Sequence, residues 1–135
     1  MMRYLLDSNV CIAYLRGRNP LVRQRLAATP SLSVCLCSVV KAELYYGCLR
    51  SEDPTANRAR VETFTQPYRC LPFDDAAAEH FATIRRHLES LGTTIGAYDL
   101  QIAATALANG YTLVTHNTRE FSRVRGLLLE DWVLP

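Results

Sequence analysis

The sequence predicts an α/β fold in which helices cover both faces of a parallel sheet. Short apolar runs of strand type alternate with longer stretches of helical periodicity along the 135 residues. This alternation is typical of β-α-β units, whose parallel sheets are buried on both faces. No internal repeat, low-complexity tract or linker interrupts it, so we expect a single domain over residues 1–135.

Capping and turn residues set the expected element ends in the first half of the chain. Ser8 and Asn9 can cap the first helix and Gly17 can end it, Pro20 can begin the second, and Ser38 can cap the third. The elements expected are a strand Tyr4–Leu6, a helix to about Arg16, a helix Pro20–Ala28, a strand Leu32–Cys35, a helix from Val39 to about Arg50, a helix Asn57–Thr65 and a strand Arg69–Leu71.

The second half contains the clearest helix of the sequence. Asp74 and Asp75 begin it, Gly92 ends it, and its apolar residues recur at helical spacing. These apolar residues are Ala77, Phe81, Ile84, Leu88 and Leu91. The remaining elements expected are a helix from about Tyr98 to Asn109 stopped by Gly110, a strand Thr112–Thr115, a short helix through Glu120 and Phe121, and an edge strand Leu127–Leu129.

The composition is that of a soluble globular protein, with 49% hydrophobic and 21% charged residues. No apolar run approaches the roughly 18 residues of a membrane span, and the N-terminus lacks a signal-peptide layout, so we expect a cytoplasmic protein without membrane contact. An odd number of cysteines, five, favours buried thiols over a disulfide framework. The net charge is only +2. Lys41 is the only lysine beside fourteen arginines, which permits phosphate binding, although a GC-rich genome is the favoured explanation.

Four acidic residues lie where a strand should end or a helix should begin. They are Asp7, Glu43, Asp99 and Glu120. The carboxyl ends of parallel strands meet at one edge of a sheet, which is where α/β proteins bind ligands. Carboxylates gathered there repel one another, and a hard divalent cation that takes oxygen ligands would offset that repulsion. The sequence therefore predicts a Mg²⁺ or Mn²⁺ site.

Several other chemistries lack their motifs. The chain has no G-x-G-x-x-G sequence, no P-loop and no G-x-S-x-G nucleophile elbow, and its three histidines are not at zinc-ligand spacing. Asp7 could be an aspartate nucleophile for phosphoryl transfer, but Asn9 stands where such enzymes carry a second acid.

Four segments of the chain together resemble the signatures of PIN-domain ribonucleases, and most closely the VapC toxins of bacterial toxin–antitoxin modules. They are Leu5-Leu6-Asp7-Ser8-Asn9, Ser38-Val39-Val40-Lys41-Ala42-Glu43-Leu44 with Tyr46-Gly47, Ile95-Gly96-Ala97-Tyr98-Asp99 with Ile102-Ala103-Ala104, and Val114-Thr115-His116-Asn117-Thr118-Arg119-Glu120-Phe121. Leu71-Pro72-Phe73-Asp74 and the C-terminal residues through Trp132 resemble the enteric-type subgroup.

The resemblance implies a three-layer α/β/α sandwich with a parallel sheet of strand order 3-2-1-4-5. It implies a metal held by Asp7, Glu43 and Asp99, with Glu120 as a fourth catalytic acid. Ser8, Ser38, Thr115 and Asn117 would line the site. Asn117 and Glu120 depart from a motif in which relatives often carry Asp, which favours one metal ion over two, and the role of His116 stays open.

The activity implied is Mg²⁺- or Mn²⁺-dependent hydrolysis of structured RNA, expected in a tRNA anticodon loop and including the initiator tRNA. Expected partners are a VapB-type antitoxin that neutralises the toxin, operator DNA reached only through that antitoxin, and a second copy of the chain in a homodimer or larger assembly. The candidate dimer contacts are the helix with Phe81, Ile84 and Leu88 and the segment Ala97–Ala108.

Two other functions stay open from the sequence. One is a PIN-fold regulatory protein without turnover, which acts through an antitoxin–DNA complex. The other is a DNA nuclease or phosphatase with the same metal site.

Overall fold

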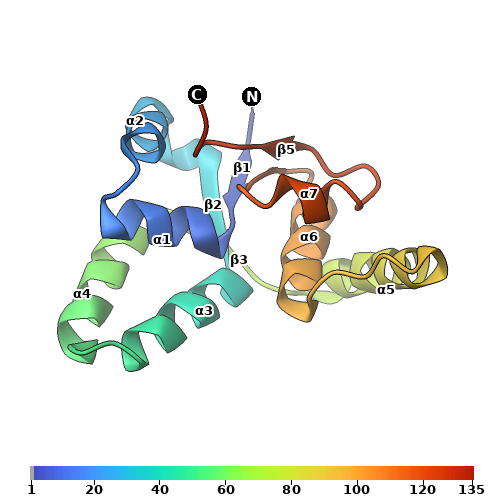
Figure 1. The fold of residues 1–135 in the computed structure, drawn as a ribbon, viewed down its shortest axis with the longest axis horizontal. Coiled ribbons are helices and arrows are strands. Elements are labelled where there is room, and N and C mark those ends of the chain that lie inside the picture. The colour runs from blue at the N-terminus through green and yellow to red at the C-terminus, as the bar shows by residue number, and fades with distance from the viewer. Residues whose placement is uncertain (1) are drawn as a thin grey trace.

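The strands form one parallel sheet in the order β3-β2-β1-β4-β5, which is the predicted order (Figure 1). The computed structural model describes residues 2–135. The strands are β1 (Tyr4–Leu6), β2 (Val34–Cys37), β3 (Arg69–Leu71), β4 (Thr112–Val114) and β5 (Leu129–Glu130). The helices are α1 (Ser8–Arg16), α2 (Pro20–Ala28), α3 (Ser38–Leu49), α4 (Pro54–Thr65), α5 (Asp75–Leu91), α6 (Ala97–Asn109) and α7 (Thr118–Phe121), with a 3-10 turn over Ser31–Ser33.

The chain reverses its direction of winding at β1, because β1 pairs with both β2 and β4. Helices α1 to α4 therefore cover one face of the sheet and α5 to α7 the other, as Figure 1 shows. A strand order that reverses in this way opens a crevice at the carboxyl ends of the two central strands. Asp7 follows β1 and Thr115 follows β4, so both residues lie at this crevice.

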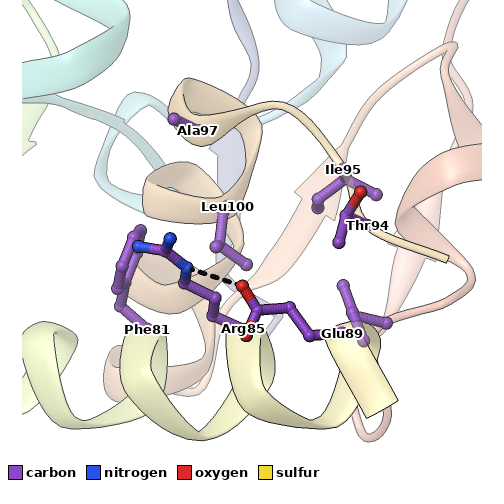
Figure 2. Close-up of a pocket in the computed structure, with 8 residues that line it drawn as sticks. Phe81, Arg85, Glu89, Thr94, Ile95, Ala97 and Leu100 are labelled. Atoms are coloured by element: carbon purple, nitrogen blue, oxygen red, sulfur yellow. Dashed lines mark hydrogen bonds and ion pairs between the residues drawn. The ribbon is translucent and has the colours of Figure 1, made fainter. Parts of the chain in front are cut away.

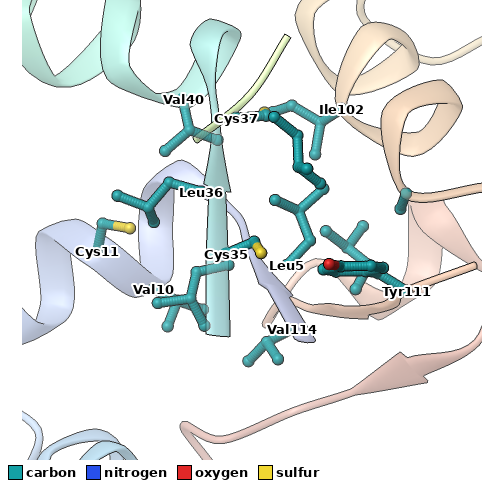
Figure 3. Close-up of a cluster of buried hydrophobic side chains, with 14 of the residues drawn as sticks. Leu5, Val10, Cys11, Cys35, Leu36, Cys37, Val40, Ile102, Tyr111 and Val114 are labelled. Carbon is teal, nitrogen blue, oxygen red and sulfur yellow. The ribbon is translucent and has the colours of Figure 1, made fainter. Parts of the chain in front are cut away.

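The core is built on the central strands, whose side chains are apolar on both faces. Leu5, Leu36 and Val114 are fully buried. Val10 on α1 and Ile102 on α6 are at most 1% exposed. Figure 3 shows these side chains packed from both sides of the sheet together with Cys11, Cys35 and Cys37. All five cysteines are free thiols, four of them buried, as the sequence predicts.

Glycines end three helices at the predicted positions. Gly17, Gly92 and Gly110 follow α1, α5 and α6 in left-handed conformation, with φ of 66°, 67° and 68°. A side chain with a Cβ is disfavoured at such angles, so glycine at these three positions sets where each helix stops.

Three predicted element starts are wrong, each for a local reason. The second strand begins at Val34, because Ser33 N–H donates to the carbonyl of Pro30 (2.9 Å) in a 3-10 turn that precedes it. Helix α4 begins at Pro54, because the Asp53 carboxylate accepts from Ala56 N–H (3.1 Å) and caps it three residues early. The last strand begins at Leu129, where it pairs with Leu113.

Two predicted helix caps are also wrong. Asp7 caps α1 in place of Ser8 or Asn9, through a hydrogen bond from Val10 N–H (2.9 Å). Ser38 is the first residue of α3, and the preceding Cys37 makes no side-chain cap. The first result gives Asp7 a structural role beside any chemical one.

Two of the α5 residues predicted to contact a second copy pack inside the domain, so they do not form that contact, and the dimer itself stays a prediction. Ile84 and Leu88 are only 7% and 1% exposed, and α5 packs along α6. Figure 2 shows Phe81, Ile95 and Leu100 around a pocket of about 230 Å³ between these helices, beside the Arg85–Glu89 ion pair (3.2 Å). Within residues 2–135, no helix is long and apolar enough to cross a membrane.

Candidate functional site

Asp7 is the buried centre of the site. It is 4% exposed at the end of β1, and its backbone N–H continues the sheet by donating to the carbonyl of Val114 (3.1 Å). One carboxylate oxygen accepts from Val10 N–H and the other from the hydroxyl of Thr115. Thr115 is fully buried after β4, so this hydrogen bond joins the two central strands where the winding reverses.

Burial raises the pKa of Asp7 above its ordinary value. The hydrogen bonds from Thr115 and Val10 stabilise the charged form and oppose this effect, while the charge of Glu43 adds to it. A carboxylate held in this environment gains from a nearby cation.

Glu43 lies in the second turn of α3, the helix that follows β2. Its Oε1 accepts a hydrogen bond from the hydroxyl of Ser8 (2.8 Å), which is the residue that follows Asp7. Ser8 is 7% exposed. The hydrogen bond therefore fixes α3 against the start of α1 and holds the two acids on neighbouring elements.

Asp99 lies in the first turn of α6, on the opposite face of the sheet from α3. Its pKa is raised to about 6, first by burial and then by the charges of Asp7, Glu120 and Glu43. Every charge in this set is negative. The other three predicted acids are thus all close enough to act electrostatically on Asp99.

Glu120 is held by the segment that follows β4. Asn117 Nδ2 donates to Glu120 Oε2 (3.1 Å), and Asn117 N–H donates to Thr115 Oγ1 (3.0 Å). Thr115 is therefore the link between the Asn117–Glu120 pair and Asp7. The structure brings together Asp7, Ser8, Glu43, Thr115, Asn117 and Glu120 through hydrogen bonds, and Asp99 through its charge interactions.

Ser38 and His116 are placed differently. Ser38 is exposed, and its hydroxyl lies 3.8 Å from the sulfur of Cys70 rather than against an acid. Its role in the site stays a prediction. His116 Nδ1 pairs with Asp131 Oδ2 (2.9 Å) on the rim of the loop after β4, with 55% of the His116 side chain exposed.

The donor set of the site fits a hard divalent cation, although it is not a closed ligand cluster. Among residues 2–135, no group of three His, Cys, Asp or Glu side chains is gathered closely enough to hold a metal ion as it stands. Asp7, Glu43 and Asp99 nevertheless offer only carboxylate oxygens, and burial together with repulsion from the neighbouring acids raises the pKa of Asp99. Mg²⁺ and Mn²⁺ prefer such oxygen ligands, and their charge would relieve the repulsion.

The raised pKa of Asp99 leads to a prediction about the metal-free protein. Between pH 3.8 and about 6 the folded chain binds more protons at Asp99 than the unfolded chain does, so stability falls as the pH rises through this range. Asp7, whose pKa is also raised, acts in the same direction. We expect Asp99→Asn to stabilise the metal-free protein at pH 7 by about 1–2 kcal/mol, a value discounted for partial exposure.

Urea unfolding of both proteins in EDTA at pH 4 and pH 7 measures this effect. The matched control is Asp75→Asn, which also removes an acid from the first turn of a helix but lies outside the site, on α5. Equal stability of Asp99→Asn and the natural chain at pH 7 would contradict the electrostatic account of the site.

Two pockets meet at Glu43. One, of about 260 Å³, lies between α1, α3 and α4 and is lined by Ile12, Leu15, Gly47 and Arg60 among others. The second, of about 410 Å³, lies between α3 and α6 and is lined by Tyr46, Tyr98 and Gln101 among others. Sequence reasoning assigned none of these three residues to the site, and it placed Tyr98 and Gln101 in the segment Ala97–Ala108 expected to contact a second copy. The position of Tyr46, three residues after Glu43, and of Tyr98, directly before Asp99, is the signal that could have identified two of them.

Comparison with known proteins identifies relatives over nearly the whole chain. Residues 4–127 match the PIN domain model. The sequence is 39% identical over 132 residues to the tRNA(fMet)-specific endonuclease VapC of Shigella flexneri, which covers 98% of this chain and 99% of that protein. It is 39% identical over 133 residues to Ribonuclease VapC2 of Haemophilus influenzae, covering 98% and 100%.

Solved structures agree with this result. A chain in the crystal structure of DNA-bound VapBC from Salmonella typhimurium superposes with a TM-score of 0.92 at 38% identity, covering 98% of this chain and 99% of that chain. VapBC2 from Rickettsia felis, bound to a DNA fragment from its promoter, superposes with a TM-score of 0.89 at 31% identity, covering 97% and 99%.

Proposed function

Because the chain belongs to the PIN-domain family, we propose that it is the endoribonuclease toxin of a VapBC-type toxin–antitoxin pair and that it cleaves tRNA. The observation that carries this proposal is the convergence of four carboxylates where the winding of the sheet reverses, with Asp7 tied to Thr115 and Glu43 tied to Ser8. The near full-length similarity to VapC endonucleases supports the same activity. Residues 1–135 form a single catalytic domain in this proposal, and a tRNA substrate places its action in the cytoplasm.

The metal in this proposal is Mg²⁺ or Mn²⁺, with Asp7, Glu43 and Asp99 as its ligands. When bound, the ion would supply positive charge against the phosphodiester and acidify the attacking water. The other side chains of the site would orient the acids and accept a proton. Thr115 and Ser8 donate to Asp7 and Glu43 and so fix the direction of each carboxylate. Glu120, held by Asn117, is the carboxylate available to accept a proton from the attacking water.

The initiator tRNA is the first substrate to test, because the relative from Shigella flexneri is named for it. Purified chain freed from any antitoxin is incubated with initiator tRNA and with a DNA of the same sequence, in Mg²⁺ or Mn²⁺. Cleavage of the RNA alone supports the proposal. Cleavage of the DNA would favour the DNA nuclease, and no cleavage of either would favour a regulatory protein without turnover.

The pocket between α1, α3 and α4 is the proposed site of the antitoxin. The apolar residues of the early helices around Val10–Leu15 and of the helix from Val39 to Leu49 favour a groove for the antitoxin here. Val10 itself is fully buried, and Ile12 and Leu15 line the pocket instead. Gly47 has nothing within 4 Å of where a Cβ would be, which leaves room beside Glu43. An apolar antitoxin helix would fill this pocket, and a basic residue that follows it would reach Glu43.

We expect the purified toxin–antitoxin complex to cleave RNA at least about 100-fold more slowly than the free chain, because a basic side chain at Glu43 would take the place of the metal and the phosphate. Leu15→Glu should restore cleavage in the presence of antitoxin, because it places a charge in the apolar part of the pocket. The control is Leu32→Glu, at a residue that is 83% exposed and outside the pocket. A complex that cleaves as fast as the free chain would refute this arrangement.

Two further partners belong to this proposal. Operator DNA would be bound through the antitoxin, as the DNA-bound VapBC relatives suggest. A homodimer or larger assembly is expected in solution, and light scattering of the free chain and of the complex measures its size.

A further inference from the structure

Two exposed tyrosines flank the second pocket at Glu43. Tyr46 on α3 and Tyr98 on α6 are 60% and 64% exposed, although they line the same pocket of about 410 Å³. Helices α3 and α6 are in contact and begin on either side of the central strands (Figure 1). The pocket therefore has one aromatic ring on each helix and an acid of the site within it.

The polar groups of the pocket suit a nucleobase with its phosphate. Gln101 supplies an amide that can both donate and accept hydrogen bonds. Beside the pocket, the guanidinium of Arg50 lies over the Tyr46 ring, 5.3 Å from its centre, and adds a positive charge near a base stacked there. Unpaired bases of RNA loops are commonly bound by stacking on aromatic rings together with hydrogen bonds to their edges.

We propose that Tyr46 and Tyr98 stack on an unpaired RNA base next to the bond that is cut, with Gln101 contacting the edge of that base. This inference rests on the proposed ribonuclease function and adds to it the residues that select the substrate. Tyr98 directly precedes Asp99 and Tyr46 lies one turn from Glu43, so a base held between them places its phosphate at the acids.

A second copy of the chain is the other occupant to consider, and the position of Glu43 argues against it. A protein surface seated on this pocket would remove the Glu43 carboxylate from water, which is costly for a charge whose hydrogen bond comes from the neutral hydroxyl of Ser8. It would also close the acids to substrate from this side. An RNA base leaves the catalytic edge open.

The test uses a hairpin with the anticodon arm of initiator tRNA and a set of hairpins that lack one loop base each. Binding is measured in the Asp99→Asn background, so that the RNA stays intact. Tyr98→Ala and Tyr46→Ala should each weaken binding about 5- to 100-fold, the range for loss of one stacked base. Tyr98→Phe and Tyr46→Phe keep the ring and should bind within about twofold of the parent, as should Leu32→Ala, which removes an exposed side chain before β2.

One hairpin in the set should identify the stacked base. This hairpin should bind the Asp99→Asn parent more weakly than the complete hairpin does. It should lose no further affinity when Tyr98→Ala is added, because removing the base and removing the ring delete the same contact. Equal losses on every hairpin, or none, would overturn the proposal. So would a change of oligomeric state in Tyr98→Ala with unchanged RNA affinity, which would mark the pocket as a contact between copies.

A separate cleavage assay distinguishes failure of the proposed ribonuclease function from failure of the stacking proposal. The natural chain, with Asp99 in place, is assayed for cleavage of the same hairpin and of whole initiator tRNA. If it cuts neither, the ribonuclease proposal fails. If it cuts and the two alanine variants bind and cut as well as the natural chain, only the stacking proposal fails.

Discussion

Asp99→Asn should reduce RNA cleavage at least about 100-fold and leave the fold intact, and Asp7→Asn and Glu43→Gln should do the same. An ion that offsets charge in the transition state contributes several kcal/mol, and each 1.4 kcal/mol is about tenfold in rate. Asp99→Asn also removes a repelled charge, so the loss of activity should come without loss of stability. Cleavage rates at pH 7 in Mg²⁺, with circular dichroism of each variant, measure both effects.

The competing explanation is that these acids only stabilise helix starts. Asp7 does cap α1, but asparagine caps helices as well, so Asp7→Asn should keep the cap. A lost cap would cost about 0.5–2 kcal/mol of stability and no catalysis. Asp75→Asn is the matched control and should cleave normally. Glu120→Gln should be milder than the other three, and full activity in Asp99→Asn would refute the catalytic assignment.

Removal of divalent metal should abolish cleavage to the same extent. In EDTA the four acids have no cation to offset their repulsion, and we expect activity to return when Mg²⁺ or Mn²⁺ is added in excess. The metal should also stabilise the folded chain by about 2.7 kcal/mol at 100 times its Kd, because the unfolded chain lacks the site. Thermal unfolding with and without metal detects this without any RNA.

Asp99→Asn separates this effect from non-specific binding of cations. The variant should show a much smaller thermal shift than the natural chain, whereas Asp75→Asn should show the full shift. Cleavage that persists in EDTA, or an equal thermal shift in all three proteins, would show that these acids do not hold a metal.

The positions of the acids could be predicted from sequence because each is fixed by a local element. Asp7 ends an apolar run that can only be a buried strand, and Asp99 stands in the first turn of a helix whose stop, Gly110, is marked in the sequence. The strand order 3-2-1-4-5 then brings the ends of β1 and β4 together. That order came from the family resemblance, because no local signal specifies which strands are neighbours.

Features that depend on side-chain packing could not be predicted in this way. The periodicity of α5 reveals an apolar face but not its partner, so Ile84 and Leu88 were predicted to contact a second copy when they pack inside the domain. The same limit applies to Tyr46 and Tyr98. Their positions next to Glu43 and Asp99 in the sequence place them near the acids, but do not reveal that two helices from opposite faces of the sheet bring both rings to one pocket.

The predicted cap of α1 was wrong for a third reason. Ser8 is a good capping residue, yet Asp7 takes that role and Ser8 donates to Glu43, 35 residues away in the sequence. Two residues that can each cap the same helix differ little in free energy, so a tertiary hydrogen bond decides between them. In this chain the tertiary bond is also the one that orients an acid of the site.

Mapping the 5′ ends of initiator tRNA fragments after incubation with the free chain tests the central claim most directly. The reaction is run in Mg²⁺, in EDTA, and with Asp99→Asn in Mg²⁺. We expect one dominant cut, within the anticodon loop, in the first reaction and none in the other two. Intact tRNA in all three reactions, or the same cut in EDTA or with Asp99→Asn, would contradict the assignment of this chain as a metal-dependent ribonuclease that acts through these acids.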